Sequence, residues 1–207
     1  PQKAFNFCFD EGILRQYLEF DKMYDEVAGG TADEYTKAIM YNTTVKGRTI
    51  HTVPMSLLVQ LGSIVDFNVP LLETVFEKIG MPYRHKQFAD RLDRARYWLE
   101  QCAPEQVYHL RDTRNWEVYD TLGEYERREI ELLYNYIKQG GYTLNELNTE
   151  LYAIPKRVFG TDLPQNELKK IQGRFFRNVY RLLLDRERGP RLYLFLYAID
   201  PARYLYL

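Results

Sequence analysis

The chain has 207 residues, of which 45% are apolar, 15% aromatic and 28% charged, so it can bury a substantial core and lacks the composition of a disordered protein. Its formal charge of −1 gives no overall attraction for nucleic acid, and no apolar run approaches the length that crosses a bilayer. Two cysteines and three histidines match no zinc-ligand spacing, which predicts a reduced cytoplasmic protein without a metal site.

Helical periodicity dominates the first half of the chain. Apolar residues recur at helical spacing from Asp10 to Val27, where a helix of about four turns is expected. The next segment is less clear, because 35–41 has the pattern of a short helix and 45–50 that of a small turn between extended residues. Three further helices are predicted over 57–64, 70–79 and 85–102.

The second half continues the helical pattern after a loop that is expected to run from Ala103 past Trp116. A helix is predicted from Gly123 to Lys138. Thr143 followed by Glu146 fits a capping box, so another helix should begin there, and Pro155 is expected to kink or end it. Strand alternation is almost absent. The sequence therefore predicts an all-α protein, built as a multi-helix bundle or cage with short connections.

The longest predicted helix begins at Gln165 and is expected to stop at Gly189, before a short helix over 192–199. One face is apolar, and a second stripe along it is purely cationic. Residues 165–207 carry nine Lys and Arg against four Asp and Glu, a net charge of +5, while the rest of the chain carries −6. This local basic surface is a plausible footprint for phosphate, although a solvated helix face would have the same pattern.

A search for catalytic patterns is mostly negative. The sequence contains no glycine-rich phosphate loop, no His-Glu-x-x-His and no Gly-x-Ser-x-Gly. Carboxylate pairs such as Glu129 and Glu131 lie on helix faces of alternating charge, where a solvated surface is the ordinary interpretation. From the residues alone, a helical binding module is favoured over an enzyme.

Three segments of the sequence carry a family resemblance. Residues 97–100 followed by 103–105 resemble the Trp-Leu-Glu-x-x-Ala-Pro-Glu stretch of class I lysyl-tRNA synthetases, and 188–191 resembles their Gly-Pro-Arg signature. Residues 1–25 are similar to the segment that follows the signature lysine loop in the same enzymes. One difference is visible, because Leu184-Asp185 stands where the family usually has a glycine shortly before Gly-Pro-Arg.

The resemblance implies the C-terminal portion of a class I lysine–tRNA ligase, with an α-helical cage of the class I anticodon-binding type. Residues 1–54 would be a helical connector that contacts the tRNA stem, and 55–207 the anticodon-binding domain. The implied partner is the anticodon stem-loop of tRNA(Lys), with no DNA and no membrane. The full-length enzyme uses ATP and Mg²⁺, but this chain has neither an HIGH-like nor a KMSKS-like motif. It is therefore expected to hold no cofactor or catalytic residue and to be inactive alone.

Arginine and lysine can contact phosphate, and arginine planes or aromatic rings can stack on unpaired bases. Trp98 lies off the apolar stripe of its helix, so it is either part of a second packing face or an exposed platform for a base. Arg191 follows Pro190 at the corner between the last two helices and is predicted to read a base. The tRNA-binding candidates are Lys170, Arg174, Arg177, Arg181, Arg191 and Trp98.

Two alternatives stay open at this point. The chain has the features of a helical scaffold for protein interactions, whose basic stripe only keeps it in solution. It also resembles the C-terminal cage of glutamyl-tRNA synthetases, although the stretch from Trp98 to Glu105 favours lysine. Salt separates the first alternative from tRNA binding, because phosphate contacts weaken steeply as salt rises and an apolar protein interface does not.

Overall fold

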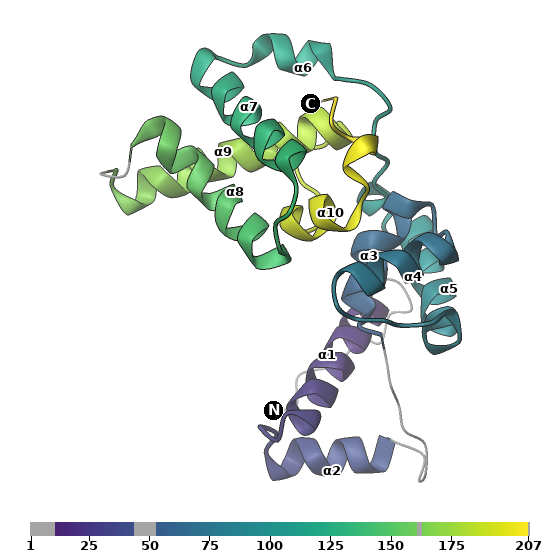
Figure 1. Ribbon diagram of the computed structural model, residues 1–207. Helices are drawn as coiled ribbons and strands as arrows, with labels where there is room; N and C mark the ends of the chain where they lie inside the picture. The colour runs from purple at the N-terminus through teal and green to yellow at the C-terminus, as the bar shows by residue number, and fades with distance from the viewer. Residues whose placement is uncertain (1–10, 44–52, 161–162, 207) are drawn as a thin grey trace. The chain divides into compact units, whose positions relative to one another are not determined.

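The computed structural model describes residues 11–43, 53–160 and 163–206 (Figure 1). Over these ranges the chain forms ten α-helices and three short 3-10 turns, and no strand. The all-α prediction is confirmed. No helix within the same ranges combines the length and the apolar character needed to cross a membrane.

The chain divides into two compact units, 1–73 with 82–107 and 74–81 with 108–207. The predicted division between residues 54 and 55 concerned roles toward tRNA, and it stays a prediction. The compact units follow a different boundary, because the helix that begins at Met55 packs against the first helix of the chain.

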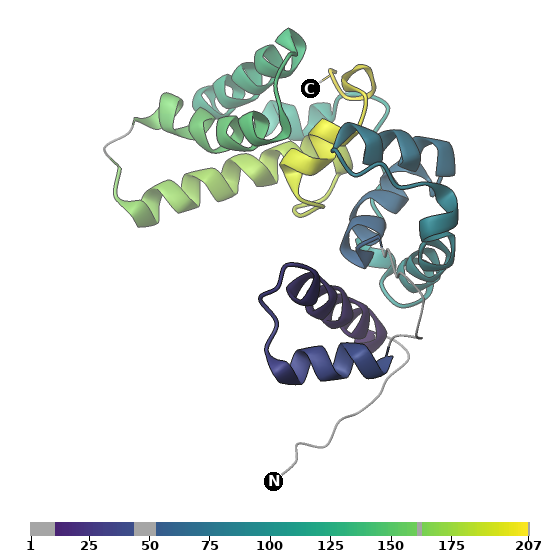
Figure 2. The ribbon, with the colours of Figure 1, turned by 60° about the horizontal axis from the view of Figure 1, so that its bottom comes forward.

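Unit 1 contains a helical hairpin, two further helices and the first part of another. α1 and α2 lie side by side, and α3 packs against both α1 and α5 (Figures 1 and 2). The predicted turn over 45–50 lies outside the described residues. The helices of this unit are α1 (Glu11–Ala28), α2 (Glu34–Thr43), α3 (Met55–Gly62), the beginning of α4 (Val69–Lys78) and α5 (His85–Gln101).

A buried ion pair holds unit 1 together. Arg91 Nη1 of α5 donates to Asp21 Oδ1 of α1 over 2.7 Å and to the carbonyl oxygen of Val53 over 3.1 Å. The second oxygen of Asp21 accepts from the backbone N–H of Met55 at 2.7 Å. Both charged side chains are 11% exposed. Because their charges and hydrogen-bonding groups are matched, the pair fixes α1, α5 and the start of α3 in one arrangement.

Unit 2 holds the second half of the chain. α7, α8 and α9 pack against one another, α10 packs on α8, and α6 on α9 (Figures 1 and 2). The core contains Phe175, Leu183 and Phe195, each fully buried. Its remaining helices are α6 (Trp116–Thr121), α7 (Glu124–Gln139), α8 (Leu144–Phe159), α9 (Gln165–Leu184) and α10 (Leu192–Ala198).

Helix starts followed the sequence more closely than helix ends. The capping box is confirmed, since Thr143 Oγ1 accepts from the Glu146 backbone N–H and Glu146 Oε2 accepts from that of Thr143. Pro155 was expected to kink or end this helix. It does not end it, because α8 continues to Phe159, and the kink stays a prediction. The prediction that the loop continues past Trp116 is also wrong. α6 begins at that residue because Asn115 caps it, accepting from Val118 N–H at 3.4 Å.

Glu129 of α7 is an unusual member of the unit 2 core. Its side chain is fully buried, and neither carboxylate oxygen has a hydrogen-bond partner within the described part of the chain. The interpretation of Glu129 as a solvated surface residue is therefore wrong. Burial raises its pKa to about 7, and Glu126 adds to the rise, while Arg174 of α9 lowers it. An isolated carboxylate in this position is costly at high pH.

We expect Asp21→Asn to lower the free energy of unfolding of unit 1 by about 3–5 kcal/mol, since it leaves the Arg91 guanidinium buried without a countercharge. Trp98 fluorescence during urea unfolding in a Trp116→Phe background reports this unit. The control is Lys22→Ala, which removes an exposed pair with Glu26 and should cost less than about 1 kcal/mol. Equal costs for the two variants would show that the buried pair does not hold the unit.

Glu129 predicts a dependence of stability on pH. Its pKa is higher in the folded state than the ordinary value of 4.5, so the folded chain binds a proton that the unfolded chain releases. Stability should therefore fall as pH rises from 4.5 to about 7 and then level off. Calorimetry should show that the free energy of unfolding of Glu129→Gln rises relative to that of the parent by up to about 3 kcal/mol between pH 5 and pH 8.

The control for this effect is Glu131→Gln, which changes an exposed carboxylate on the same helix. It should follow the parent at every pH. If the stability of Glu129→Gln also follows that of the parent at every pH, the pKa of Glu129 is not raised in the folded chain.

Candidate nucleic-acid interface

The four cations predicted to form one stripe lie on α9, but their surroundings differ. Lys170 and Arg177 are exposed, whereas Arg174 and Arg181 are partly buried. Arg177 Nε lies 4.0 Å from Glu187 Oε2, and both side chains are more than half exposed, so water and salt weaken this ion pair. Lys170 and Arg177 are the members of the stripe that an anionic partner can reach most directly.

Arg174 is engaged within its own unit. Its Nε lies 3.1 Å from Glu126 Oε1 of α7, and its guanidinium carbon lies 5.1 Å from the ring centroid of Phe159 at the end of α8. Its charge also opposes the rise in the pKa of Glu129. Arg174 thus joins α7, α8 and α9, and its contact with tRNA stays a prediction that has to compete with these interactions.

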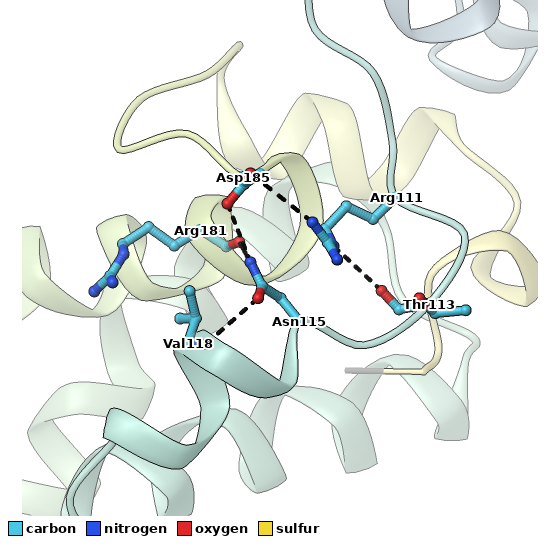
Figure 3. A network of polar contacts seen from close by, with 6 residues as sticks. All are labelled: Arg111, Thr113, Asn115, Val118, Arg181 and Asp185. Atoms are coloured by element: carbon cyan, nitrogen blue, oxygen red, sulfur yellow. Dashed lines mark hydrogen bonds and ion pairs between the residues drawn. The ribbon is translucent and has the colours of Figure 1, made fainter.

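The end of α9 is fixed by a polar network (Figure 3). Asn115 Nδ2 donates to the Arg181 carbonyl oxygen and to Asp185 Oδ1, both over 3.1 Å. Arg111 Nη1 lies 3.9 Å from Asp185 Oδ2, and its backbone N–H donates to the Leu183 carbonyl oxygen. Figure 3 shows the Arg181 guanidinium pointing away from this network. The loop before α6 is therefore fixed to α9 through the backbone of Arg181 and not through its charge.

Asp185 explains why α9 ends where it does. Its φ of 54° is left-handed, a conformation in which glycine is favoured and Asp is tolerated better than most residues. The contacts with Asn115 and Arg111 hold the aspartate in this conformation. The predicted stop at Gly189 is wrong, because this tertiary network ends the helix at Leu184.

The corner between α9 and α10 has room only for glycine at position 189. A Cβ atom at Gly189 would lie 2.7 Å from the Tyr180 ring and 2.9 Å from Leu184, closer than van der Waals contact allows. The Tyr180 hydroxyl donates to the Pro190 carbonyl oxygen over 2.5 Å. Burial raises the pKa of Tyr180, so the hydroxyl keeps its proton and remains a donor. The Gly-Pro-Arg segment is thereby held against α9, with Arg191 as the exposed N-cap residue of α10.

This arrangement places Arg191 at a small aromatic pocket of about 190 Å³. Tyr152 is 47% exposed, and its ring meets Phe176 edge to face with centroids 5.1 Å apart. The structure therefore brings Arg191 together with aromatic side chains from two other helices. The lining residues are Asn148, Leu151 and Tyr152 of α8, Phe176 and Tyr180 of α9, Arg191 at the corner, and Leu192 and Tyr193 of α10.

Trp98 belongs to unit 1 and is 5% exposed. Of the two interpretations left open by the sequence, packing is the one that the structure favours, and Trp98 is not an exposed platform for a base. Its ring borders an apolar groove of about 490 Å³ formed with residues of α1, including Leu14 and Tyr17.

Sequence reasoning missed Tyr152 and Asn148. Leu147, Leu151 and Ile154 form the buried stripe of α8, and Tyr152 lies off that stripe. An aromatic residue outside the apolar face of an amphipathic helix was the available signal for an exposed ring. Asn148 carried no comparable signal, because a polar residue next to an apolar stripe is ordinary on a surface helix.

Comparison with known proteins adds the family context. No protein-family model matches the chain. Three similar curated relatives are lysine–tRNA ligases, from Streptomyces coelicolor (27% identical over 98% of this chain), Pyrococcus horikoshii (28% over 97%) and Borreliella burgdorferi (21% over 99%). The chain spans 37%, 38% and 39% of their lengths, respectively.

Two further relatives, from Pyrococcus furiosus and Thermoplasma volcanium, have the same name and match 97% and 96% of this chain. Similarity that covers nearly every residue is stronger than agreement at a few motifs. This chain is therefore a relative of the lysine–tRNA ligases along almost its entire length, which confirms the resemblance carried by its sequence motifs.

Proposed function

We propose that this chain is the C-terminal, tRNA-binding part of a class I lysine–tRNA ligase and that it recognises the anticodon stem-loop of tRNA(Lys). The observation that carries the proposal is the similarity of nearly the whole chain to a little over a third of several lysine–tRNA ligases. In this proposal, residues 55–207 bind the anticodon, 1–54 contact the tRNA stem, and the protein acts in the cytoplasm.

The proposal assigns binding, not catalysis, to these residues. The sequence has neither an HIGH-like nor a KMSKS-like motif, so the step that joins lysine to tRNA belongs to the rest of such a ligase. ATP and Mg²⁺ would serve that step, and no residue of this chain is assigned to them.

The surface around α9 supports recognition of RNA. Lys170 and Arg177 are exposed cations that phosphate can approach, and the pocket beside Arg191 offers aromatic faces. Unpaired bases in RNA loops are commonly recognised by stacking on such rings and by hydrogen bonds to their edges. Phosphate contacts hold the RNA in position, and base contacts select the sequence.

We expect Lys170→Ala, Arg177→Ala and Arg181→Ala to weaken binding of every tRNA alike and to reduce the slope of log affinity against log salt by about one each. The thermal midpoints of Lys170→Ala and Arg177→Ala should stay near that of the parent, since exposed charges contribute under about 1 kcal/mol. Arg181→Ala keeps the backbone contact with Asn115, so its midpoint should change little as well. Arg174→Ala should lower the midpoint as well, because it also removes the contacts with Glu126 and Phe159.

The control for the cationic stripe is Arg128→Ala, an exposed arginine of α7 that pairs with Glu131. Filter binding at several salt concentrations measures both affinity and slope. If a variant that combines Lys170→Ala, Arg177→Ala and Arg181→Ala binds tRNA as tightly as the parent at low salt, the stripe has no part in binding.

Arg191 is predicted to read a base. Arg191→Ala should narrow the difference in affinity between a stem-loop with a UUU anticodon and one with a changed middle base, at a cost of about 1–3 kcal/mol for the cognate loop. The matched control is Arg188→Ala, an exposed arginine before the same corner. A discrimination ratio that is the same in parent and Arg191→Ala would show that Arg191 does not read the sequence, whatever the absolute affinities.

A further inference from the structure

The pocket between α8, α9 and α10 has the size of a site for one ring. Its volume of about 190 Å³ is below the roughly 300–1,000 Å³ typical of pockets for drug-sized ligands. Tyr152 and Phe176 supply aromatic surface, and the half-exposed Tyr152 ring is accessible from solvent. Aromatic faces of this kind stack well on planar bases.

The polar groups at this pocket match a pyrimidine. Arg191 presents only donors, whereas the Asn148 amide presents donors and an acceptor. Uracil offers two carbonyl acceptors and one N–H donor, so these two side chains can satisfy all three groups. A purely apolar ligand could accept no hydrogen bond from Arg191 and form none with Asn148, which disfavours a hydrophobic side chain of a protein as the occupant.

Gly173 is a second, independent feature of the same surface. It lies in the interior of α9, where glycine costs about 1 kcal/mol relative to alanine. A Cβ atom there would meet no described atom within 4 Å, so internal packing does not require the glycine. Gly173 lies one helical turn before Phe176 and between two exposed cations, Lys170 and Arg177, on neighbouring turns. A bare stretch of helix flanked by cations admits the close approach of a phosphate group.

We propose that this pocket takes one unpaired pyrimidine base from an RNA loop, which is uracil in the anticodon loop of the proposed function, and that an adjacent phosphate passes over Gly173 between Lys170 and Arg177. The inference rests on the proposed function and adds to it a specific base site. The base stacks on the Tyr152 ring, Phe176 meets that ring edge to face and forms the wall beside it, Arg191 and Asn148 contact the edge of the base, and the absence of a side chain at Gly173 leaves room for the RNA backbone.

The test uses the 207-residue chain and a stem-loop with three uridines at the anticodon, together with three versions that each lack one of these bases. Fluorescence anisotropy gives the affinities of the parent and of Tyr152→Ala. Tyr152→Ala should weaken the intact loop about tenfold, the effect of one lost stacking interaction. At one of the three positions, removal of the base should cause no additional loss in Tyr152→Ala, because both changes remove the same contact.

Controls separate stacking from folding and from size. Tyr152→Phe keeps the ring and should restore binding. Tyr152→Ala loses the contact with Phe176, worth about 0.5–1.5 kcal/mol, so its thermal midpoint should fall by a few degrees and stay well above the temperature of the binding assay. A purine at the position identified in this way should weaken binding as much as the missing base. Independent, additive losses at all three positions would overturn the pocket, and equal affinity for a purine would overturn its preference for a pyrimidine.

Gly173→Gln tests the path of the phosphate with a variant that does not destabilise the helix. Glutamine is a better helix former than glycine, so the thermal midpoint should rise while stem-loop affinity falls several-fold. Asn135→Gln, at an exposed position of α7, is the matched control and should bind like the parent. Unchanged affinity in Gly173→Gln would overturn the close approach over this residue.

The inference and the proposed function fail differently. If the parent does not bind the intact stem-loop even at low salt, the proposed function is wrong and the base site falls with it. If the parent binds the stem-loop, and the losses of affinity caused by Tyr152→Ala and by removal of a base add at all three anticodon positions, only the base site is wrong.

Discussion

The contact between Gly189 and the Tyr180 ring is the constraint on which the candidate site depends. No side chain can stand at position 189 unless this ring or Leu184 moves, and the Tyr180 hydroxyl then holds the Pro190 carbonyl oxygen. Because Pro190 is fixed, Arg191 stands as the N-cap residue of α10 at the same pocket as Phe176. A Gly-Pro pair that the sequence presents as an ordinary helix stop and start is, in the folded chain, a spacer between two helices that closes one wall of a pocket.

The cations of the α9 stripe have different surroundings, and some of them contribute to the packing of unit 2 while others stay accessible to a partner at the surface. Arg174 turns toward Glu126 and Phe159 and lies close enough to the buried Glu129 to influence its pKa. Arg177 keeps its charge at the surface, 4.0 Å from the exposed carboxylate of Glu187. Helical spacing places these residues on one stripe, but it does not show which of them meets a neighbouring helix. A basic stripe is therefore a weaker indication of a binding surface than the number of its charges suggests.

The two units show two ways of handling polar groups away from water. In unit 1, Asp21 and Arg91 neutralise each other and also satisfy the backbone at Val53 and Met55. In unit 2, Glu129 is buried without a hydrogen bond from any described residue, and its pKa is raised to about 7, so the side chain is protonated below that pH. The first arrangement gives specificity to the packing of three segments, and the second makes the packing of α7 sensitive to pH. Neither pattern was visible before the helices were placed in space.

The sequence by itself determined the all-α class, most helix starts and the family resemblance. Apolar spacing and local capping residues such as Thr143 act within one or two turns of helix, so they can be read without a fold. Only the tertiary structure decided the end of α9 at Leu184, the short helix α6, the burial of Trp98 and Glu129, and the pocket at Tyr152. Each of these depends on a contact between residues far apart in the chain, such as that of Asn115 with Asp185, and no local pattern specifies such a contact.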